Sequence, residues 1–414
     1  MKQTADLLVD FMKSYNIKES VFDDITSNLS SLITTDELGN MTEYGQVYEL
    51  LQNIYSTDRM MSKLTQPCSR MLKECYWKSN EISCNILFRK IKTTQGFCCG
   101  FNHYGTFDIS DLVAREPVNN SYFSGGTGPA LGLKVIMDLE EDQYKSSIKP
   151  VYGFNVAVQP PTDFPEMNLL SYSLEASEDL TLSVTPKLFV SAKSIRSVPL
   201  KRRQCLFPDE GTLEWTNVYS YKTCTSECKA RAIYQYCKCW PYYYPLLKSL
   251  RICSLLDVKC LGLHKYNYST MNDDPEDDDE LSTADKCNCY PQCNEIQYTL
   301  HSDRAKATPM QDYFNTNYSI LNVHYDTVGC HKTEKDVYNT WDRALSSVGG
   351  IVGFCIGGSI ITVIEIVFFF CQSIFYTLRK KPKVTQINTI NQDLYTNFKP
   401  NIQKTMMKPL KNFT

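Results

Sequence analysis

The longest apolar run of the chain covers residues 348–378, close to the C-terminus. Its thirty-one residues include one charged side chain, Glu365, and are interrupted near the middle by Gly357-Gly358-Ser359. A continuous helix of that length would extend about 46 Å, whereas the hydrocarbon core of a bilayer is about 30 Å thick. The run therefore predicts a membrane span that is tilted or broken, and the glycines predict the break.

Small residues form a stripe along the same segment. Ser346, Gly350, Gly353 and Gly357 follow one another at steps of four, three and four, which places them on one helical face. Such a face lets neighbouring backbones approach closely, so we expect other helices beside it. An ionisable group such as Glu365 costs about 3 kcal/mol near mid-span, which favours an aqueous path. Two simpler interpretations stay open: plain helix dimerisation, and a glutamate in the headgroup layer.

Apolar residues alternate with other residues in the middle of the chain. The alternation covers residues 131–139, 152–158 and 180–184, as is typical of half-buried strands. It predicts a central sheet.

Helical spacing dominates elsewhere. Apolar positions at this spacing over residues 44–55 stop before Thr65-Gln66-Pro67, so the first part of the chain predicts an exposed helical layer. A further helix is expected over residues 225–236.

Charge is distributed unevenly about the apolar run. The chain has a formal net charge of −3, but residues 379–414 carry eight Lys and Arg against the single Asp393, which leaves −10 for the rest. Because positive flanks stay cytoplasmic, we expect the tail inside and the preceding residues outside. A nucleic-acid role for the tail is the less economical alternative.

The chain contains eighteen cysteines, sixteen of them before the apolar run. This number indicates an oxidising compartment. Cys355 and Cys371 lie within the run and are expected to be free. Zinc binding is a minor alternative, because paired C-x-x-C ligand sets are missing and the chain has only five histidines. Glycosylation triplets compatible with an ectodomain occur at Asn28, Asn40, Asn119, Asn267 and Asn317.

Spacing within residues 205–293 favours a ladder of disulfides. Cys224 and Cys228 share a face of the expected helix, and Cys287 and Cys289 share one side of an extended segment. Two adjacent rungs could therefore form. One arrangement that satisfies this geometry pairs Cys228 with Cys287, Cys224 with Cys289 and Cys205 with Cys293, although the sequence alone does not fix the connectivity.

Seven acids occupy eight positions over residues 273–280. Such a run is typical of a solvated loop, with cation attraction or proton sensing as alternatives. The sequence contains no nucleophile elbow, phosphate loop, metalloprotease helix or dinucleotide fingerprint. We therefore expect neither an enzyme nor a cofactor.

Six motifs occur in order along the chain: FCCGFN at residues 97–102, LGLKVIMDLEEDQY at 131–144, CLFPDE at 205–210, YKTCTSECKARAIYQYCKCWPYYYP at 221–245, CNCYPQCNEIQY at 287–298 and GGIVGFCIGGSIITVIE at 349–365. Together they resemble the degenerin and epithelial sodium channel family, and they look closest to its insect pickpocket branch. The likeness covers residues 68–375.

The resemblance implies a subunit of a trimeric, sodium-selective, amiloride-sensitive channel of the plasma membrane, gated by a ligand or by a mechanical stimulus. Its partners would be homologous subunits, in a homo- or heterotrimer, together with sodium ions and membrane lipid. The family's filter motif falls on Gly357, Gly358 and Ser359. The family's gate position falls on Ser346, and Glu365 matches an acid of the inner pore, whereas a further family acid is replaced by Phe368.

The implied fold is an α+β membrane protein with a cysteine-rich ectodomain and one C-terminal transmembrane helix. Its expected regions are a helical finger-like part (1–130), a palm sheet (131–204), a disulfide-rich thumb (205–293), return palm strands and wrist (294–341), the pore helix (342–378) and a basic cytoplasmic tail (379–414).

The resemblance also implies disulfides. It carries over the ladder and adds pairs of Cys237 with Cys260, Cys239 with Cys253 and Cys75 with Cys84. A family bridge of Cys98 to a cysteine after the first membrane helix has no partner strand here. Cys68, Cys99 and Cys330 have no assigned partner, and any of them could take up Cys98.

Departures from the family pattern limit what is implied. No first membrane helix and no His-Gly gating motif precedes the ectodomain. We therefore expect the first membrane helix to lie upstream of Met1 or to be lacking. Val158-Gln159 replaces the acid pair of acid-sensing members, so proton gating is not implied. The alternative function is a truncated, non-conducting regulatory subunit or a single-pass cysteine-rich receptor.

Overall fold

The computed structural model divides the chain into two compact units, residues 1–337 and residues 338–414. It describes residues 18–36, 48, 49, 52, 56–105, 121–144, 147–149, 152–167, 171–246, 249–270, 287–307, 318–357 and 359–379. The first unit contains the strands and the disulfides, and the second contains two apolar helices.

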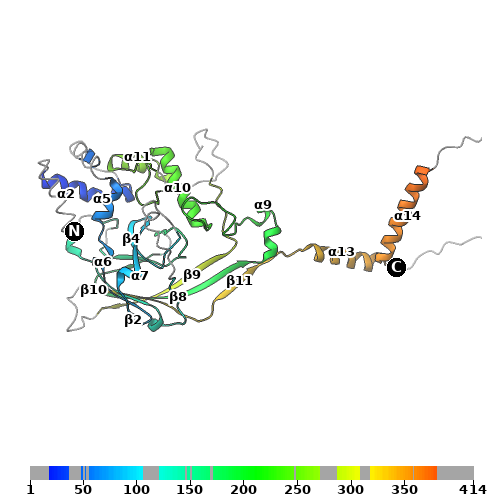
Figure 1. The fold of residues 1–414 in the computed structure, drawn as a ribbon, viewed down its shortest axis with the longest axis horizontal. Helices are drawn as coiled ribbons and strands as arrows, with labels where there is room; N and C mark the ends of the chain where they lie inside the picture. The colour runs from blue at the N-terminus through cyan, green and yellow to red at the C-terminus, as the bar shows by residue number, and fades with distance from the viewer. Residues whose placement is uncertain are drawn as a thin grey trace, which may run out of the picture. The chain divides into compact units, whose positions relative to one another are not determined.

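A mixed sheet of seven strands forms the centre of the first unit (Figure 1). Its members are β1 (Leu72–Trp77), β2 (Asn80–Glu81), β5 (Leu133–Asp138), β8 (Glu178–Ser191), β9 (Glu295–Lys306), β10 (Tyr318–Tyr325) and β11 (His331–Lys335). The order along the main path is β11-β8-β10-β5-β1-β2, and β9 pairs with β8 on its other edge. β10 lies between β5, to which it is antiparallel, and β8, to which it is parallel. It therefore neighbours two strands that come more than a hundred positions earlier in the sequence.

The core of this sheet follows from the alternation of apolar residues. Buried side chains of β5 and β8 belong to one cluster: Leu133, Val135, Met137, Leu180 and Leu182. The strands predicted around residues 131–139, 152–158 and 180–184 are confirmed as β5, β6 (Phe154–Ala157) and β8. β5 begins two residues later than predicted because the short helix η1 (Pro129–Leu131) precedes it.

The region before residue 131 is less helical than predicted. Besides β1 and β2 it contains the hairpin of β3 (Phe88–Thr93) and β4 (Gly96–Phe101). Further along the chain, β6 pairs with β7 (Ser171–Leu174) in a separate two-stranded sheet. Gly96 has φ +95°, a conformation that glycine adopts without strain and that turns the chain between β3 and β4. The helical spacing upstream does not continue past Pro67, so the prediction extended too far.

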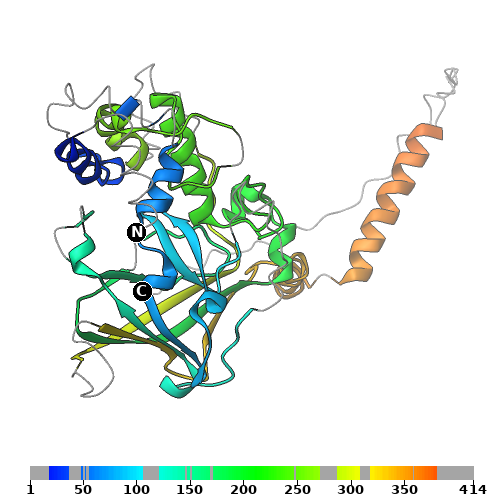
Figure 2. The same ribbon diagram turned by 60° about the vertical axis from the view of Figure 1, so that its left-hand side comes forward.

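The dark blue helix α2 and the green helices α10 and α11 lie together in the view of Figure 2. The helices described in the first unit are α2 (Glu19–Asn28), α3 (Ser31–Thr34), α5 (Thr57–Leu64), α6 (Cys68–Met71), α7 (Cys84–Leu87), α9 (Leu200–Arg203), α10 (Tyr221–Cys237), α11 (Val258–Leu263) and α12 (Lys265–Thr270), with 3-10 turns η2 (Glu141–Gln143), η3 (Lys193–Ser197) and η4 (Leu255–Asp257). The helix predicted over residues 225–236 is confirmed as α10. It starts earlier because Ser220 caps it, accepting a hydrogen bond from the Thr223 N–H.

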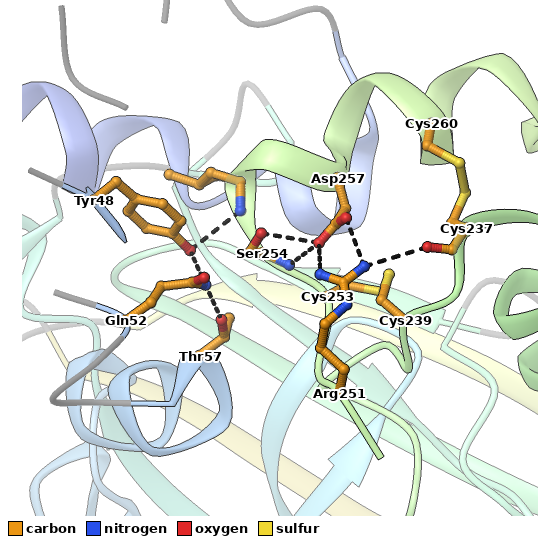
Figure 3. Close-up of polar contacts among 11 residues, drawn as sticks. Tyr48, Gln52, Thr57, Cys237, Cys239, Arg251, Cys253, Ser254, Asp257 and Cys260 are labelled. Carbon is orange, nitrogen blue, oxygen red and sulfur yellow. Dashed lines mark hydrogen bonds and ion pairs between the residues drawn. A yellow bond between two sulfur atoms is a disulfide. The ribbon is translucent and has the colours of Figure 1, made fainter. Parts of the chain in front are cut away.

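The N-terminal helical layer packs against the cysteine-rich segment. Tyr48, which is fully buried, accepts hydrogen bonds at its hydroxyl from the Leu255 N–H (3.1 Å) and from Gln52 Nε2 (3.2 Å). Asp257, two residues after Leu255, accepts two hydrogen bonds from Arg251 and one from the Ser254 N–H (Figure 3). These contacts join residues separated by about two hundred positions, so the two segments form one body.

Candidate functional site

The apolar run forms two helices with a break between them. α13 (Trp341–Ile356) ends where the Gly357 N–H donates to the Gly353 carbonyl (3.1 Å), and α14 (Ile360–Arg379) follows. Gly357 has φ +64°, in the left-handed region that favours glycine. The break predicted at the glycines is therefore confirmed, and it divides the pore helix expected over residues 342–378 into two helices, because a left-handed residue ends the helical hydrogen bonding.

Ser359 begins the second helix. Its hydroxyl accepts a hydrogen bond from the Thr362 N–H (3.3 Å) and lies 3.2 Å from the Thr362 hydroxyl. This is an N-cap, which satisfies one of the unpaired N–H groups of the first turn. Gly358 lies outside the described residues.

Of the described residues, only α14 is long and apolar enough to cross a membrane, as far as length and composition decide. Its twenty residues extend about 30 Å, which matches the thickness of the hydrocarbon core. No side chain of α14 is buried by other parts of the chain. The helix is therefore a candidate span in its own right.

The remaining pore candidates lie on these two helices. Ser346, Gly350 and Gly353 follow one face of α13, and a Cβ added to Gly350 would meet nothing within 4 Å. Glu365 lies in the first half of α14 and is exposed. The structure places the candidate residues on both sides of the break.

The cysteine-rich segment carries the ladder of disulfides. Cys224–Cys289 and Cys228–Cys287 connect α10 to residues 287–293, and Cys205–Cys293 connects the segment between α9 and α10 to the same residues. Three further bonds are those expected from the resemblance: Cys237–Cys260, Cys239–Cys253 and Cys75–Cys84. Cys355 and Cys371 are free thiols, as expected.

A seventh disulfide was not assigned from the sequence. Cys68 at the start of α6 bonds to Cys99 of β4, and this leaves Cys98 and Cys330 as free thiols. The alternative in which Cys68, Cys99 or Cys330 takes up Cys98 is therefore wrong. Cys98 points to the opposite side of β4, where burial raises the pKa of its thiol and Thr93 Oγ1 lies 3.3 Å from its sulfur.

Two glycosylation candidates fall on described helices. Asn267 is exposed on α12, whereas Asn28 is half-buried and donates from its amide nitrogen to the Asp24 carbonyl (2.8 Å). Asn40, Asn119 and Asn317 lie outside the described residues, as does the acidic run of residues 273–280.

Two buried acids were not singled out from the sequence. Asp163 is 2% exposed near the start of α10; burial raises the pKa of its carboxyl, and a hydrogen bond with Ser220 and the charge of Lys222 oppose the shift. Glu227, on α10, accepts from the Trp215 N–H (2.8 Å) and pairs with Arg231 (2.9 Å). No local pattern marks either residue as buried. In the part of the chain that the structure describes, no group of three or more His, Cys, Asp or Glu side chains could hold a metal ion.

Comparison with known proteins defines the class. The family described as "Amiloride-sensitive sodium channel" matches residues 3–369, which is most of the chain. The chain therefore belongs to this family, and it is a degenerin-type, pickpocket-like member. The family is one of ion channels and not of enzymes.

Individual relatives come from several animals. The chain is 29% identical to Pickpocket protein 28 of Drosophila melanogaster over 78% of this chain and 60% of that protein. It is 21% identical to Degenerin deg-1 of Caenorhabditis elegans over 82% of this chain and 43% of that protein, and 22% identical to Acid-sensing ion channel 4-B of Danio rerio over 78% and 56%. The chain spans about 60% of the length of the pickpocket relative.

Proposed function

We propose that the chain is part of a subunit of a trimeric, sodium-selective, amiloride-sensitive cation channel in the plasma membrane. The observation that carries the proposal is the left-handed Gly357 between two apolar helices, followed by the Ser359 cap. Family membership supports it, because the matching family is described as an amiloride-sensitive sodium channel. The sequence does not select between a ligand and a mechanical stimulus for gating.

The break is the proposed selectivity filter. An irregular backbone is tolerated at membrane depth where it lines a water-filled path, and there it can present carbonyl groups to a partly dehydrated cation. Gly357, Gly358 and Ser359 have small side chains or none, so three copies could approach closely. In this proposal Ser346 is the gate position, Gly350 and Gly353 line the outer pore, and Glu365 attracts cations inside.

The first unit corresponds in this proposal to the ectodomain. The mixed sheet would be the palm, the segment of α10 with its disulfide ladder the thumb, and the N-terminal helical layer the finger. Seven disulfides fit an oxidising compartment. The basic residues from Arg379 onward favour a cytoplasmic C-terminus.

Electrophysiology of a subunit that contains this chain, expressed in oocytes alone and with related subunits, tests the proposal. A sodium current blocked by amiloride is expected. Ser346→Val should increase that current, because a bulky side chain is expected to hold the pore open. Gly349→Ala is the matched control, since Gly349 lies off the stripe of small residues and a Cβ there meets nothing within 4 Å. Absence of current in every combination would contradict the proposal.

A further inference from the structure

Two of the five histidines of the chain lie in one row across the mixed sheet. Ser183 of β8 is paired with His301 of β9 on one edge and with His324 of β10 on the other. Side chains at paired positions point to the same face of a sheet. The two imidazole rings therefore share a face, and only the small side chain of Ser183 lies between them.

This row belongs to the polar face of the sheet. Leu182, which precedes Ser183 in β8, is fully buried, and because side chains alternate along a strand Ser183 points to the opposite face. On that face the amide nitrogen of Asn322 donates to Asp179 Oδ1 (2.9 Å) and to Thr181 Oγ1 (3.2 Å). These neighbours satisfy one another, and their hydrogen bonds include neither histidine.

Both rings can offer a nitrogen to a ligand. His301 is exposed, and among the described residues no hydrogen bond or ion pair involves its ring. Nε2 of His324 lies 3.4 Å from Ser183 Oγ, which is a long contact, and its Nδ1 is buried without a hydrogen-bond partner. A neutral imidazole keeps a lone pair on one nitrogen. Since no short hydrogen bond fixes the tautomer of His324, either of its nitrogens can carry that lone pair.

Strand spacing sets the separation of the two rings. Neighbouring strands lie about 4.8 Å apart, so the backbones of β9 and β10 are about 10 Å apart across β8. Each side chain has to cover about half of this separation, and a metal–nitrogen bond supplies about 2 Å of it. One ion above Ser183 can therefore be bound by both rings. Because the described ranges contain no group of three or more His, Cys, Asp or Glu at metal-binding distance, water molecules would complete the coordination.

We propose that His301 and His324 together bind one divalent transition-metal ion, such as Zn²⁺, on the polar face of the sheet. Imidazole nitrogen is a preferred ligand of zinc, copper and nickel. The chain before Arg379 has a net charge of −10, which attracts cations. The bound ion links β9 to β10 across β8 and opposes any separation of these strands. The proposal does not depend on the membrane placement of α13 and α14.

Calorimetric titration of the full chain with Zn²⁺ tests this proposal. The chain is solubilised in detergent without a polyhistidine tag, and its accessible thiols are alkylated so that free cysteines such as Cys330 do not compete for the ion. The test variants are His301→Asn and His324→Asn. The matched control is His331→Asn, which removes an exposed histidine from β11.

A site for one Zn²⁺ per chain is expected. Each test variant should weaken binding by at least about tenfold, because the loss of even an outer hydrogen-bond partner of a ligating histidine typically costs about 10–100-fold. The control should bind as the unchanged chain does. Ser183→Asp should tighten binding, since it adds a carboxylate ligand between the rings. With Cu²⁺, electron paramagnetic resonance should show coupling to two imidazole nitrogens in the unchanged chain and to one in each test variant.

An affinity for Zn²⁺ that is unchanged in both test variants, or that falls equally in the control, overturns the proposal. Coupling of Cu²⁺ to a single nitrogen in the unchanged chain also overturns it, because the ion then lies on one ring. Thermal unfolding without metal shows whether each variant folds. If a test variant does not fold, the affinity of Ser183→Asp and the copper spectrum of the unchanged chain decide the question.

Discussion

Single residues decide the conformation of the two apolar helices. Gly357 ends α13 with φ +64°, and the Ser359 hydroxyl caps α14. An L-residue in the left-handed region costs roughly 1–2 kcal/mol, so only glycine holds the break without strain. The break is therefore encoded at one position.

Gly357→Ala should favour continuation of α13 into α14. Spin labels at positions 345 and 370 in the full chain would then report a distance distribution shifted toward about 38 Å, the rise of twenty-five residues in one helix. Gly349→Ala, which stays inside α13, should leave the distribution unchanged. An unchanged distribution in Gly357→Ala would mean that contacts with other copies, and not the local backbone, maintain the break.

Asp163 should make the stability of the first unit depend on pH. Its carboxyl has a raised pKa because of burial, while Ser220 and Lys222 favour the ionised form and Glu295 opposes it. Between the ordinary aspartate value, about 3.9, and the raised folded value, the folded state binds more protons. The free energy of unfolding due to this group therefore falls as the pH rises through that window.

Asp163→Asn is expected to remove this slope and to leave the unit at least as stable at neutral pH. Thermal unfolding of the solubilised chain from acidic to neutral pH measures it. Asp303→Asn, an exposed change on β9, is the control. A slope that survives in Asp163→Asn would assign the pH dependence to other groups.

At the scale of elements, disulfides connect α10 to residues 287–293. Cys224–Cys289 lies between the other two rungs of the ladder, which close loops of 88 and 59 residues. Because the inner rung already closes most of the loop, the middle rung adds only a small ring. Its contribution is therefore smaller than that of a bond closing the whole loop.

Removing the middle rung with Cys224→Ala/Cys289→Ala should lower the free energy of unfolding by about 2 kcal/mol, at the lower end of the usual range for a disulfide. Denaturant unfolding under non-reducing conditions measures the change. Cys330→Ser, at an exposed free thiol, should change it by less than about 0.5 kcal/mol. A loss above about 4 kcal/mol would indicate that the rungs form cooperatively.

At the scale of the whole molecule, the N-terminal helical layer and the cysteine-rich segment share a core. Ile25, Leu29 and Tyr48 pack with Tyr242 and Val258 in one cluster. The hydrogen bond from the Leu255 N–H to the Tyr48 hydroxyl joins two members of this cluster. Displacement of one segment would therefore disturb the packing of the other.

Tyr48→Phe should destabilise the unit by about 1–3 kcal/mol, because it leaves the Leu255 N–H buried without this acceptor. Hydrogen exchange of the peptide containing Leu255 should quicken, whereas strands β5 and β8 should keep their protection. Tyr152→Phe, at a hydroxyl-bearing ring that is 59% exposed, serves as the control. Unchanged exchange at Leu255 would show that another group, such as a water molecule, replaces the hydroxyl.

The sequence by itself determined the features that depend on short-range periodicity. Alternation located β5, β6 and β8, helical spacing located α10, and the glycines located the break. Family motifs named the class and implied six of the disulfides. Each of these features involves residues a few positions apart, or a motif kept as a unit, so the tertiary structure was not needed.

The tertiary structure alone decided which distant segments meet. Adjacent Cys98 and Cys99 point to opposite sides of β4, and only the position of α6 selects Cys99 as the partner of Cys68. The parallel pairing of β10 with β8 and the approach of Lys335 to α9 likewise join residues over a hundred positions apart. The burial of Asp163 brings it to Ser220 and Lys222, more than fifty positions further along the chain. No local pattern contains such contacts, because they depend on the packing of the whole first unit.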